Sequence, residues 1–296
     1  MNTVSVIIPT FKNRGGLVKS IESVLSQNYD GLIEVIVVDD NDPQNEFRAK
    51  TEKLMMQFQK DKRVIYIKHE CNKNGSAARN TGIKASRGNF IGLLDDDDMY
   101  MPGKISCQVS YLNEHPEMDA VYTFFKCGSR CCSKAIIEGD GSRQILLMES
   151  NFQTSTLLFR RESLLRINGF DESFRRHQDY EMMLRFFASD SKLGCIPEVY
   201  VEMGKNLAEN DLVGVRLEEL KSYFLSKFSS FIQKENEKTP GFANKVYSKH
   251  YASVFLSHIK HKYYNRAIKI FFKGIFKSPF VFVSLLYKSL KIHMSL

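Results

Sequence analysis

Four short apolar runs, separated by stretches with helical spacing, divide the first hundred residues of the chain. They are β-prone, and three of them are followed by Pro or Asp; short apolar runs of this kind are typical of buried strands. The runs cover residues 4–8, 33–38, 64–67 and 89–94. Helices are predicted after Gly16, in a polar segment that reaches about residue 60, and from Ser76 to Ala85. This alternation predicts an α/β fold with a Rossmann-like, doubly wound, mostly parallel sheet flanked by helices.

Beyond residue 102 the alternation loosens. A helix is expected to start near Pro102, after a turn at residues 99–102, because Pro is tolerated at the first helical position. A stretch rich in Gly, Cys and Ser, which ends at about residue 141, predicts a hairpin or a loop. The other expected elements are strands at 119–125 and 154–159 and helices at 161–167 and 178–187.

Four consecutive carboxylates, Asp95 to Asp98, follow the last of the four apolar runs. Ionised carboxylates at this spacing repel one another, so a cation must offset them or they must extend into water. The carboxyl end of a buried strand is where ligands bind in α/β proteins. Such an oxygen-rich cluster suits Mg²⁺ or Mn²⁺ bound together with substrate phosphates. The alternative is a solvated acidic turn.

The turn after the first strand, residues 9–16, lacks the G-x-G-x-x-G spacing of a dinucleotide-binding domain. The acidic cluster suggests instead that phosphates are held through a metal ion. Asp39 and Asp40, at the end of the second strand, fit carboxylates that face a ribose or a base. Both would equally suit a turn or a helix N-cap.

The net charge of +8 resides in the C-terminal part of the chain. No Asp or Glu follows Glu237, and residues 238–296 carry 11 Lys and Arg, which leaves −3 for residues 1–237. This tail contains no recognised nucleic-acid-binding motif, so nucleic acid is not an expected partner.

The six Cys are expected to be reduced thiols in the cytoplasm, because no basic segment precedes the first apolar run as in a signal peptide. Cys127, Cys131 and Cys132 lack the spaced His or Cys partners of a zinc site. No uncharged run approaches the ~20 residues needed to span a bilayer, so no transmembrane helix is expected.

A series of short motifs follows in a recognisable order. They are Val4-Ser-Val-Ile-Ile-Pro-Thr-Phe11, Ile36-Val-Val-Asp-Asp-Asn41, Asn74-Gly-Ser-Ala-Ala-Arg-Asn-Thr-Gly-Ile83, Gly88-Asn-Phe-Ile-Gly-Leu-Leu-Asp-Asp-Asp-Asp98, Phe159-Arg-Arg161, Gly169-Phe-Asp-Glu172 and Gln178-Asp179. Together they resemble glycosyltransferase family 2, whose members are inverting enzymes with the GT-A fold. The resemblance covers about residues 3–200.

The resemblance implies a GT-A catalytic domain at residues 1–210 and a helical, basic C-terminal extension at 211–296. The domain would have a nucleotide-sugar half at about 1–102 and an acceptor half at about 103–210. The resemblance also implies a nucleotide-diphospho-sugar donor, such as a UDP-sugar, and a divalent cation, Mn²⁺ or Mg²⁺. The implied donor-site residues are Pro9, Thr10, Phe11 and Asp40 at the base and ribose, Asn74 and Arg79 in the nucleotide pocket, Asp95 and Asp96 nearer the diphosphate, and Asp97 as the metal ligand.

Asp179 falls on the family's catalytic-base position, the second residue of a motif that usually reads Glu-Asp. Gln178 replaces the Glu, so the base is retained, but the residue that would make the motif's supporting contact is different. Asp179 also lies in the first turn of a predicted helix, where the helix dipole favours a carboxylate, so capping is its alternative role. In the implied reaction a cation stabilises the departing nucleoside diphosphate, and a carboxylate takes the proton of the acceptor hydroxyl.

The resemblance thus implies metal-assisted, inverting sugar transfer to a glycan or lipid-linked glycan, as in the assembly of bacterial surface polysaccharides. One alternative is a sugar-nucleotide-binding module without catalysis, against which the presence of Asp97 and Asp179 counts. Another is a sugar-phosphate nucleotidyltransferase, which would carry a Gly-rich loop directly after the first strand.

Residues 262–277 of the tail predict an amphipathic helix. Its apolar stripe, at i, i+3, i+4, i+7 and i+8, consists of Ile268, Phe271, Phe272, Ile275 and Phe276. Basic residues occupy a separate stripe, which suits the interface of an anionic bilayer. A second apolar patch at 280–287 is too short to span a membrane. The tail therefore predicts peripheral attachment to the cytoplasmic face of the membrane; the alternative is a helical appendage packed on the catalytic domain.

Overall fold

The computed structural model describes residues 2–12, 15–132, 135–150, 152–204 and 212–294. The chain forms two compact units. The N-terminal unit comprises residues 1–142 and 150–207, and the C-terminal unit comprises residues 143–149 and 208–296. The predicted boundary between residues 210 and 211 lies outside the described residues.

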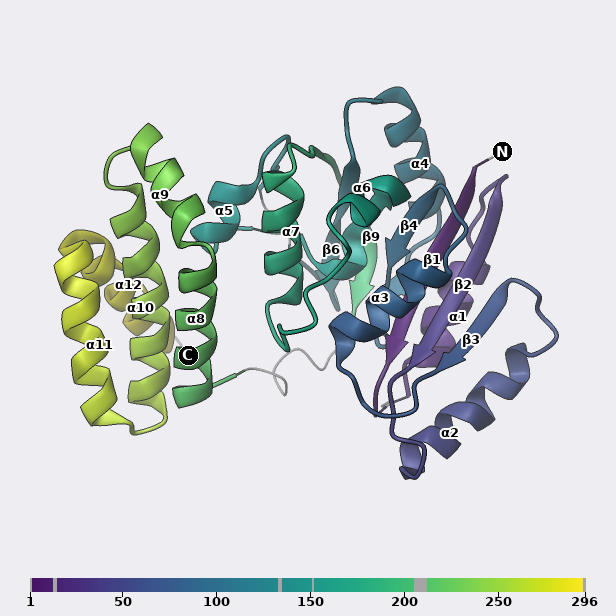
Figure 1. The fold of residues 1–296 in the computed structure, drawn as a ribbon, viewed down its shortest axis with the longest axis horizontal. Coiled ribbons are helices and arrows are strands. Elements are labelled where there is room, and N and C mark those ends of the chain that lie inside the picture. The colour runs from purple at the N-terminus through teal and green to yellow at the C-terminus, as the bar shows by residue number, and fades with distance from the viewer. Residues whose placement is uncertain (1, 13–14, 133–134, 151, 205–211, 295–296) are drawn as a thin grey trace. The chain divides into compact units, whose positions relative to one another are not determined.

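The N-terminal unit is built around one mixed sheet (Figure 1). In the described residues this sheet has nine strands in the order β3-β2-β1-β4-β8-β6-β9-β5, with β7 paired to β6. The strands are β1 (Thr3–Thr10), β2 (Leu32–Asp39), β3 (Val64–Lys68), β4 (Phe90–Leu93), β5 (Met99–Tyr100), β6 (Ala120–Cys127), β7 (Arg130–Cys131), β8 (Leu157–Arg160) and β9 (Leu193–Met203).

Strands β1 to β4 pair in parallel, as the alternation of strands and helices predicts. Helices cover both faces of this half, and α3 crosses the front of the strands in Figure 1. The helices of this unit are α1 (Leu17–Leu25), α2 (Glu46–Met55), α3 (Gly75–Ala85), α4 (Lys104–Glu114), α6 (Arg161–Arg166) and α7 (Gln178–Ala188). Because parallel strands share their direction, the carboxyl ends of β1, β2 and β4 meet at one edge of the sheet.

The second half of the sheet differs from the prediction in three places. Residues 99–100, expected in a turn, form β5, which pairs antiparallel with β9. Residues 154–156 form a 3₁₀ turn, and the expected strand starts only at Leu157. Strand β9 was not predicted; it pairs with β6 through register shifts at residues 123–125, opposite Pro197 and Glu198. Proline removes a ladder hydrogen bond and obscured the strand in the sequence.

The C-terminal unit is helical. Its elements are α8 (Gly214–Lys227), α9 (Ser229–Lys238), α10 (Phe242–Lys260), α11 (Tyr264–Lys277) and α12 (Pro279–Met294), together with most of α5 (Ser142–Leu146). Helix α10 contacts the other four C-terminal helices. Residues 143–149 fall inside the predicted 1–210 domain, but they pack with these helices: Arg143 forms an ion pair with Glu235 at 3.1 Å.

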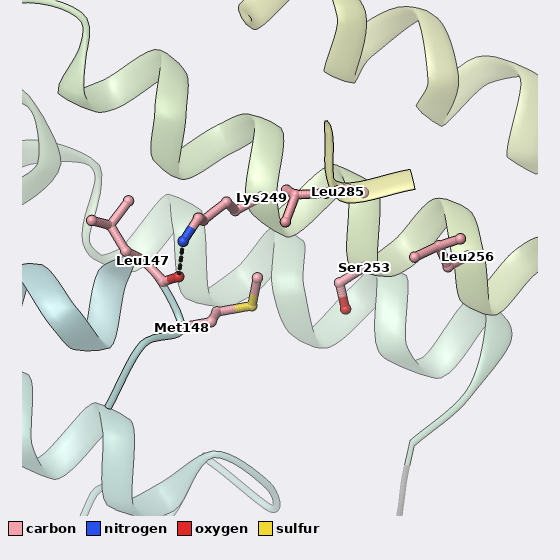
Figure 2. Close-up of a pocket in the computed structure, with 7 residues that line it drawn as sticks. Leu147, Met148, Lys249, Ser253, Leu256 and Leu285 are labelled. Atoms are coloured by element: carbon pink, nitrogen blue, oxygen red, sulfur yellow. Dashed lines mark hydrogen bonds between the residues drawn. The ribbon is translucent and has the colours of Figure 1, made fainter. Parts of the chain in front are cut away.

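A cavity of about 390 Å³ lies within the C-terminal unit, between residues 147–148 and helices α10 and α12. Its lining is mostly apolar, and Leu256 and Leu285 contribute to it. Figure 2 shows Lys249 at this cavity, where its ammonium donates a hydrogen bond to the carbonyl oxygen of Leu147. Among the described residues, no helix combines the length and the apolar character required to cross a membrane.

Candidate active site

The four predicted carboxylates form a turn between β4 and β5, which we call the acidic turn, Asp95–Asp98. Asp95, Asp96 and Asp98 each bond to other parts of the N-terminal unit. Asp95 accepts a hydrogen bond from Arg79 at 2.5 Å, and Asp96 accepts one from the Thr10 hydroxyl at 2.5 Å. Asp98 accepts hydrogen bonds from the hydroxyl of Ser155 and the backbone N–H of Gly204. The acidic turn is therefore fixed by β1, α3 and the end of β9.

Burial and mutual repulsion raise the pKa values of two carboxyl groups in the acidic turn. The pKa of Asp96 is raised to about 7, chiefly by burial; the charges of Asp97 and Asp95 add to the shift, and the hydrogen bond from Thr10 opposes it. Burial and Asp95 likewise raise the pKa of Asp98 to about 8. The close spacing of these carboxyl groups opposes their full ionisation, which a bound cation would favour.

Two glycines give the backbone of the acidic turn its space. A Cβ on Gly16, at the start of α1, would lie 2.5 Å from the carbonyl oxygen of Asp96 and 2.7 Å from Cα of Asp97. A Cβ on Gly204 would lie 2.9 Å from Cγ and from Oδ2 of Asp97. Side chains at either position would displace Asp97, so its placement depends on both glycines.

The acidic turn fits a divalent cation held partly by a substrate. Among the residues that the structure describes, no three His, Cys, Asp or Glu side chains form a group that could hold a metal ion alone. Mg²⁺ is commonly bound by one or two carboxylates with substrate phosphates and water completing its shell. Asp97, already implied as a metal ligand, is suited to hold such a cation.

Arg79 on α3 links the acidic turn to the predicted base. Its guanidinium donates to Asp95 at 2.5 Å and to the side-chain oxygen of Gln178 at 2.7 Å. It is almost fully buried, and its Nε has no hydrogen-bond partner among the described residues. Gln178 precedes Asp179 in the first turn of α7. Although Glu is the usual residue of the motif at this position, Gln178 makes a side-chain hydrogen bond there, to Arg79.

Asp179 is partly buried in the same turn of α7. Burial raises the pKa of its carboxyl group, whereas the backbone N–H of Tyr180 and the charge of Arg79 oppose the shift. The residue at the helix N-cap is His177, which adopts a left-handed conformation and makes no side-chain cap hydrogen bond. The negative charge of Asp95 also contributes to raising the pKa of Asp179.

The segment 170–178, which leads into α7, is bonded along its length to α3. The Asn80 side chain donates to the carbonyl oxygen of Phe170 and accepts from its backbone N–H, both at 2.8 Å. The Ser76 hydroxyl donates to the carbonyl oxygen of Phe174 at 3.2 Å. Gly169 makes the close approach possible, because its φ is +65° and a Cβ there would clash with Asn80. Helix α3 thus positions the segment that carries Asp179.

Asp40 is almost completely buried, and its carboxylate accepts four hydrogen bonds within the protein. The donors are Asn72 Nδ2, the backbone N–H groups of Lys73 and Asn74, and His69 Nδ1, at distances of 2.7 to 2.9 Å. A carboxylate offers about four acceptor positions. A direct contact with a ribose or base, as the resemblance implies, would have to displace one of these donors. In this structure Asp40 holds the loop 72–74 that precedes α3.

The side chain of Asn74 is likewise engaged in hydrogen bonds within the protein. Its side-chain oxygen caps α3 by accepting from the backbone N–H groups of Ser76 and Ala77, and its Nδ2 donates to the carbonyl oxygen of Glu172. Its φ of 90° is unusual for a residue with a side chain. The structure gives Asn74 a role in holding the loop and α3 in place.

The end of β1 presents a different surface. Thr10 is buried and bonded to Asp96, whereas the ring of Phe11 is 44% exposed. The backbone N–H of Phe11 also bonds to Asp96. Pro9 precedes these residues in register with Val38 on β2. This arrangement leaves an aromatic ring beside the acidic turn.

Replacing Asp40 with Ala is expected to lower the free energy of unfolding by about 2 to 3 kcal/mol, because four donors lose their acceptor in a buried position. Urea denaturation measures the change. The exposed Asp30→Ala is the control and should alter stability by less than about 0.5 kcal/mol. Unchanged stability combined with weaker donor binding would instead assign Asp40 to direct nucleotide contact.

The contact between Arg79 and Gln178 and the two bonds to Asp98 were not predicted from the sequence. Gln178 was noted as a departure from the motif, but nothing in the sequence identified its partner, which lies 99 positions earlier. Gly204 and Ser155 lie outside the recognised motifs. Only the pairing of β5 with β9, which sequence patterns did not indicate, brings Gly204 to the acidic turn.

The chain is similar in sequence to known proteins. The chain is 28% identical over 231 residues to the uncharacterised glycosyltransferase MJ1057 of Methanocaldococcus jannaschii, covering 76% of this chain and 78% of that protein. It is 30% identical over 243 residues to the uncharacterised glycosyltransferase RP339 of Rickettsia prowazekii, covering 76% and 72%.

The fold is also similar to that of a solved protein. The crystal structure of Staphylococcus aureus TarS 1-349 in complex with UDP-GlcNAc matches with a TM-score of 0.63 at 17% identity, over 97% of this chain and 92% of that one. The predicted GT-A fold is thereby confirmed. The family model described as glycosyl transferase family 2 matches residues 5–167, more than half of the chain. The protein therefore belongs to glycosyl transferase family 2.

Proposed function

We propose that the protein is an inverting glycosyltransferase that moves a sugar from a nucleotide-diphospho-sugar to an acceptor hydroxyl. The observation that carries this proposal is the link made by Arg79, which bonds to Asp95 in the acidic turn and to Gln178 beside Asp179. One side chain thus joins the groups suited to the leaving diphosphate and the group suited to the acceptor proton.

Asp179 is the catalytic base in this proposal. A carboxylate with a raised pKa is a better proton acceptor than an ordinary one, and Asp179 has such a pKa because of its burial. One base suffices for a single inverting displacement, whereas a glycoside hydrolase uses a pair of carboxylates flanking the bond. The bond between Arg79 and Gln178 would orient the first turn of α7 and with it Asp179.

The acidic turn is the proposed site of the donor diphosphate and its cation. Asp97 would hold Mn²⁺ or Mg²⁺, and Asp96 would approach the ribose and diphosphate. The bound cation would stabilise the negative charge that develops on the departing nucleoside diphosphate. Arg79 would add a fixed positive charge next to Asp95, since its guanidinium is always protonated.

The nucleotide is proposed to lie beyond the end of β1, where Pro9, Thr10 and Phe11 follow one another. The exposed ring of Phe11 is suited to contact a base. Asp40 and Asn74 are proposed to act by shaping this pocket through the loop 72–74. Uridine is the proposed nucleoside, because TarS, which shares the fold, was crystallised in complex with UDP-GlcNAc.

The acceptor is proposed to be a glycan or a lipid-linked glycan used in bacterial surface polysaccharide assembly, reached at the cytoplasmic face of the membrane. Transfer is tested with a panel of nucleotide sugars in the presence and absence of Mn²⁺, with released nucleoside diphosphate as the signal. NMR of the product then gives the anomeric configuration, which should be inverted. Donor binding without transfer or hydrolysis under any condition would favour a binding module that lacks catalysis.

The pH dependence of kcat offers a second test. A general base acts only as a carboxylate, so kcat should fall as the pH drops through the raised pKa of Asp179. The ascending limb is therefore expected above pH ~4, where an ordinary Asp titrates. Measuring kcat at saturating donor, acceptor and Mn²⁺ confines the profile to the enzyme–substrate complex. A limb at pH ~4 or below would contradict the role of Asp179.

A further inference from the structure

Helix α11 has more apolar surface than its packing uses. One face is buried in the C-terminal unit through Ala267, Ile270 and Gly274. Phe271, on the same side, lies 5.6 Å from the ring of Phe282 on α12. Through these contacts α11 packs into the C-terminal unit. In the rest of its apolar stripe, Ile275 is half-buried, whereas Ile268, Phe272 and Phe276 are exposed.

A second face of α11 carries exposed apolar residues four positions apart, and α12 carries further ones; together we call them the aromatic ridge. On this ridge Phe276 is 82% exposed and Phe280 is 89% exposed. Large apolar side chains are rarely left in water together unless they mark an interaction surface. The ridge consists of Ile268, Phe272 and Phe276 on α11 and Phe280, Val283 and Tyr287 on α12.

A third face of α11 carries three exposed lysines four residues apart, which we call the basic row: Lys269, Lys273 and Lys277. Residues four apart in a helix lie on one face, so the row runs along the ridge. No Asp or Glu follows Glu237 in the sequence, so no carboxylate from α11 or α12 offsets this charge.

We propose that the aromatic ridge and the basic row form a docking surface for an anionic lipid bilayer. Rings that enter the headgroup region and lysines that contact anionic lipids are the two components of interfacial binding by an amphipathic helix. A two-fold interface between copies of this chain would bring the basic rows together without acidic partners, which disfavours the second copy as occupant. The biological use of this surface, to meet a lipid-linked acceptor, rests on the proposed function, whereas the binding itself does not.

Flotation of the full chain with vesicles, in the absence of donor, tests the proposal. Binding is expected with vesicles containing about 30% phosphatidylglycerol and not with pure phosphatidylcholine. Phe276→Ser combined with Phe280→Ser should weaken binding at least tenfold, because two exposed rings no longer enter the interface. Lys269→Gln combined with Lys273→Gln should weaken it about 25-fold, since each basic residue near an anionic surface contributes about fivefold.

Matched control variants remove exposed side chains of the same kinds from the N-terminal unit. Leu32→Ser combined with Met56→Ser deletes two exposed apolar side chains, and Lys53→Gln combined with Lys60→Gln deletes two exposed lysines. All control variants should bind as the wild type does. Circular dichroism melting should show that every variant remains folded.

Three results would overturn the proposal. The first is wild-type protein that does not bind anionic vesicles at low salt, and the second is variants that lose no more binding than their controls do. The third is a dimer in light scattering that the Phe276→Ser and Phe280→Ser changes convert to a monomer, which would assign the ridge to a second copy. Because flotation requires no transfer, it can fail while the glycosyltransferase assay succeeds, and the reverse.

Discussion

Asp179→Asn is expected to lower kcat about a thousandfold while the affinity for the donor stays within a few-fold of wild type. Asn keeps the shape of the side chain and can accept a hydrogen bond from the backbone N–H of Tyr180, but it cannot take a proton. The measurements are steady-state transfer with the preferred donor and calorimetry of nucleoside diphosphate binding in the presence of Mn²⁺.

The control for this change is Asp190→Asn, an exposed residue just beyond the other end of α7. Asn tolerates its φ of 61°, so the substitution should leave kcat unchanged. If Asp179→Asn also turned over at a near-wild-type rate, Asp179 would have no role beyond the helix N-terminus, and the base would have to be sought elsewhere.

Asp97→Asn is expected to remove the Mn²⁺-dependent part of donor binding, which we expect to exceed a factor of about 100. The amide keeps the shape that fits against Gly204, so the turn should stay in place. Since the charge of Asp97 raises the pKa values of Asp96 and Asp98, its removal should lower both. Calorimetry with UDP, with and without Mn²⁺, gives both affinities.

An exposed acid, Asp30→Asn, serves as the control for this experiment and should leave metal-dependent binding intact. If Asp97→Asn left the Mn²⁺-dependent affinity for UDP unchanged, the result would contradict the assignment of Asp97 as the metal ligand. A lower melting temperature would show that Asp97 has a structural role in the acidic turn.

The parallel half of the fold could be predicted from the sequence because each of its strands is a compact apolar run. The predicted strand at 33–38 is observed as Leu32–Asp39, and the predicted helix at 76–85 as Gly75–Ala85. Strands β5 and β9 gave no such signal, because one has two residues and the other contains Pro197. Their pairing depends on distant residues, which a local pattern does not register.

The candidate site was predictable as a set of residue types, but not as a set of contacts. The motifs pointed to Asp40 and Asn74, yet their side chains bond to neighbouring backbone groups. Arg79 was placed in the nucleotide pocket, while its partners Asp95 and Gln178 appeared only in the structure. Hydrogen-bond partners across 16 and 99 positions depend on the tertiary fold.

The tail illustrates the same limit for apolar residues. Periodicity placed Phe271 and Phe276 on one stripe of the helix at 262–277. In the structure Phe271 packs against Phe282, whereas Phe276 is exposed. Helical spacing gives the direction of a side chain, but whether another element covers it depends on how the neighbouring helices pack.

The bonding of α3 to the segment 170–178 has a consequence for exchanging parts between relatives. A natural way to alter acceptor preference is to graft the second half of one enzyme onto the first half of another. Here Asn80 and Ser76 belong to the first half, but they hold backbone groups of the second. A graft at residue 102 would separate these partners and misplace Asp179 even if both parents were active. Chimeras of this enzyme should therefore inherit α3 and the segment 170–178 from the same parent.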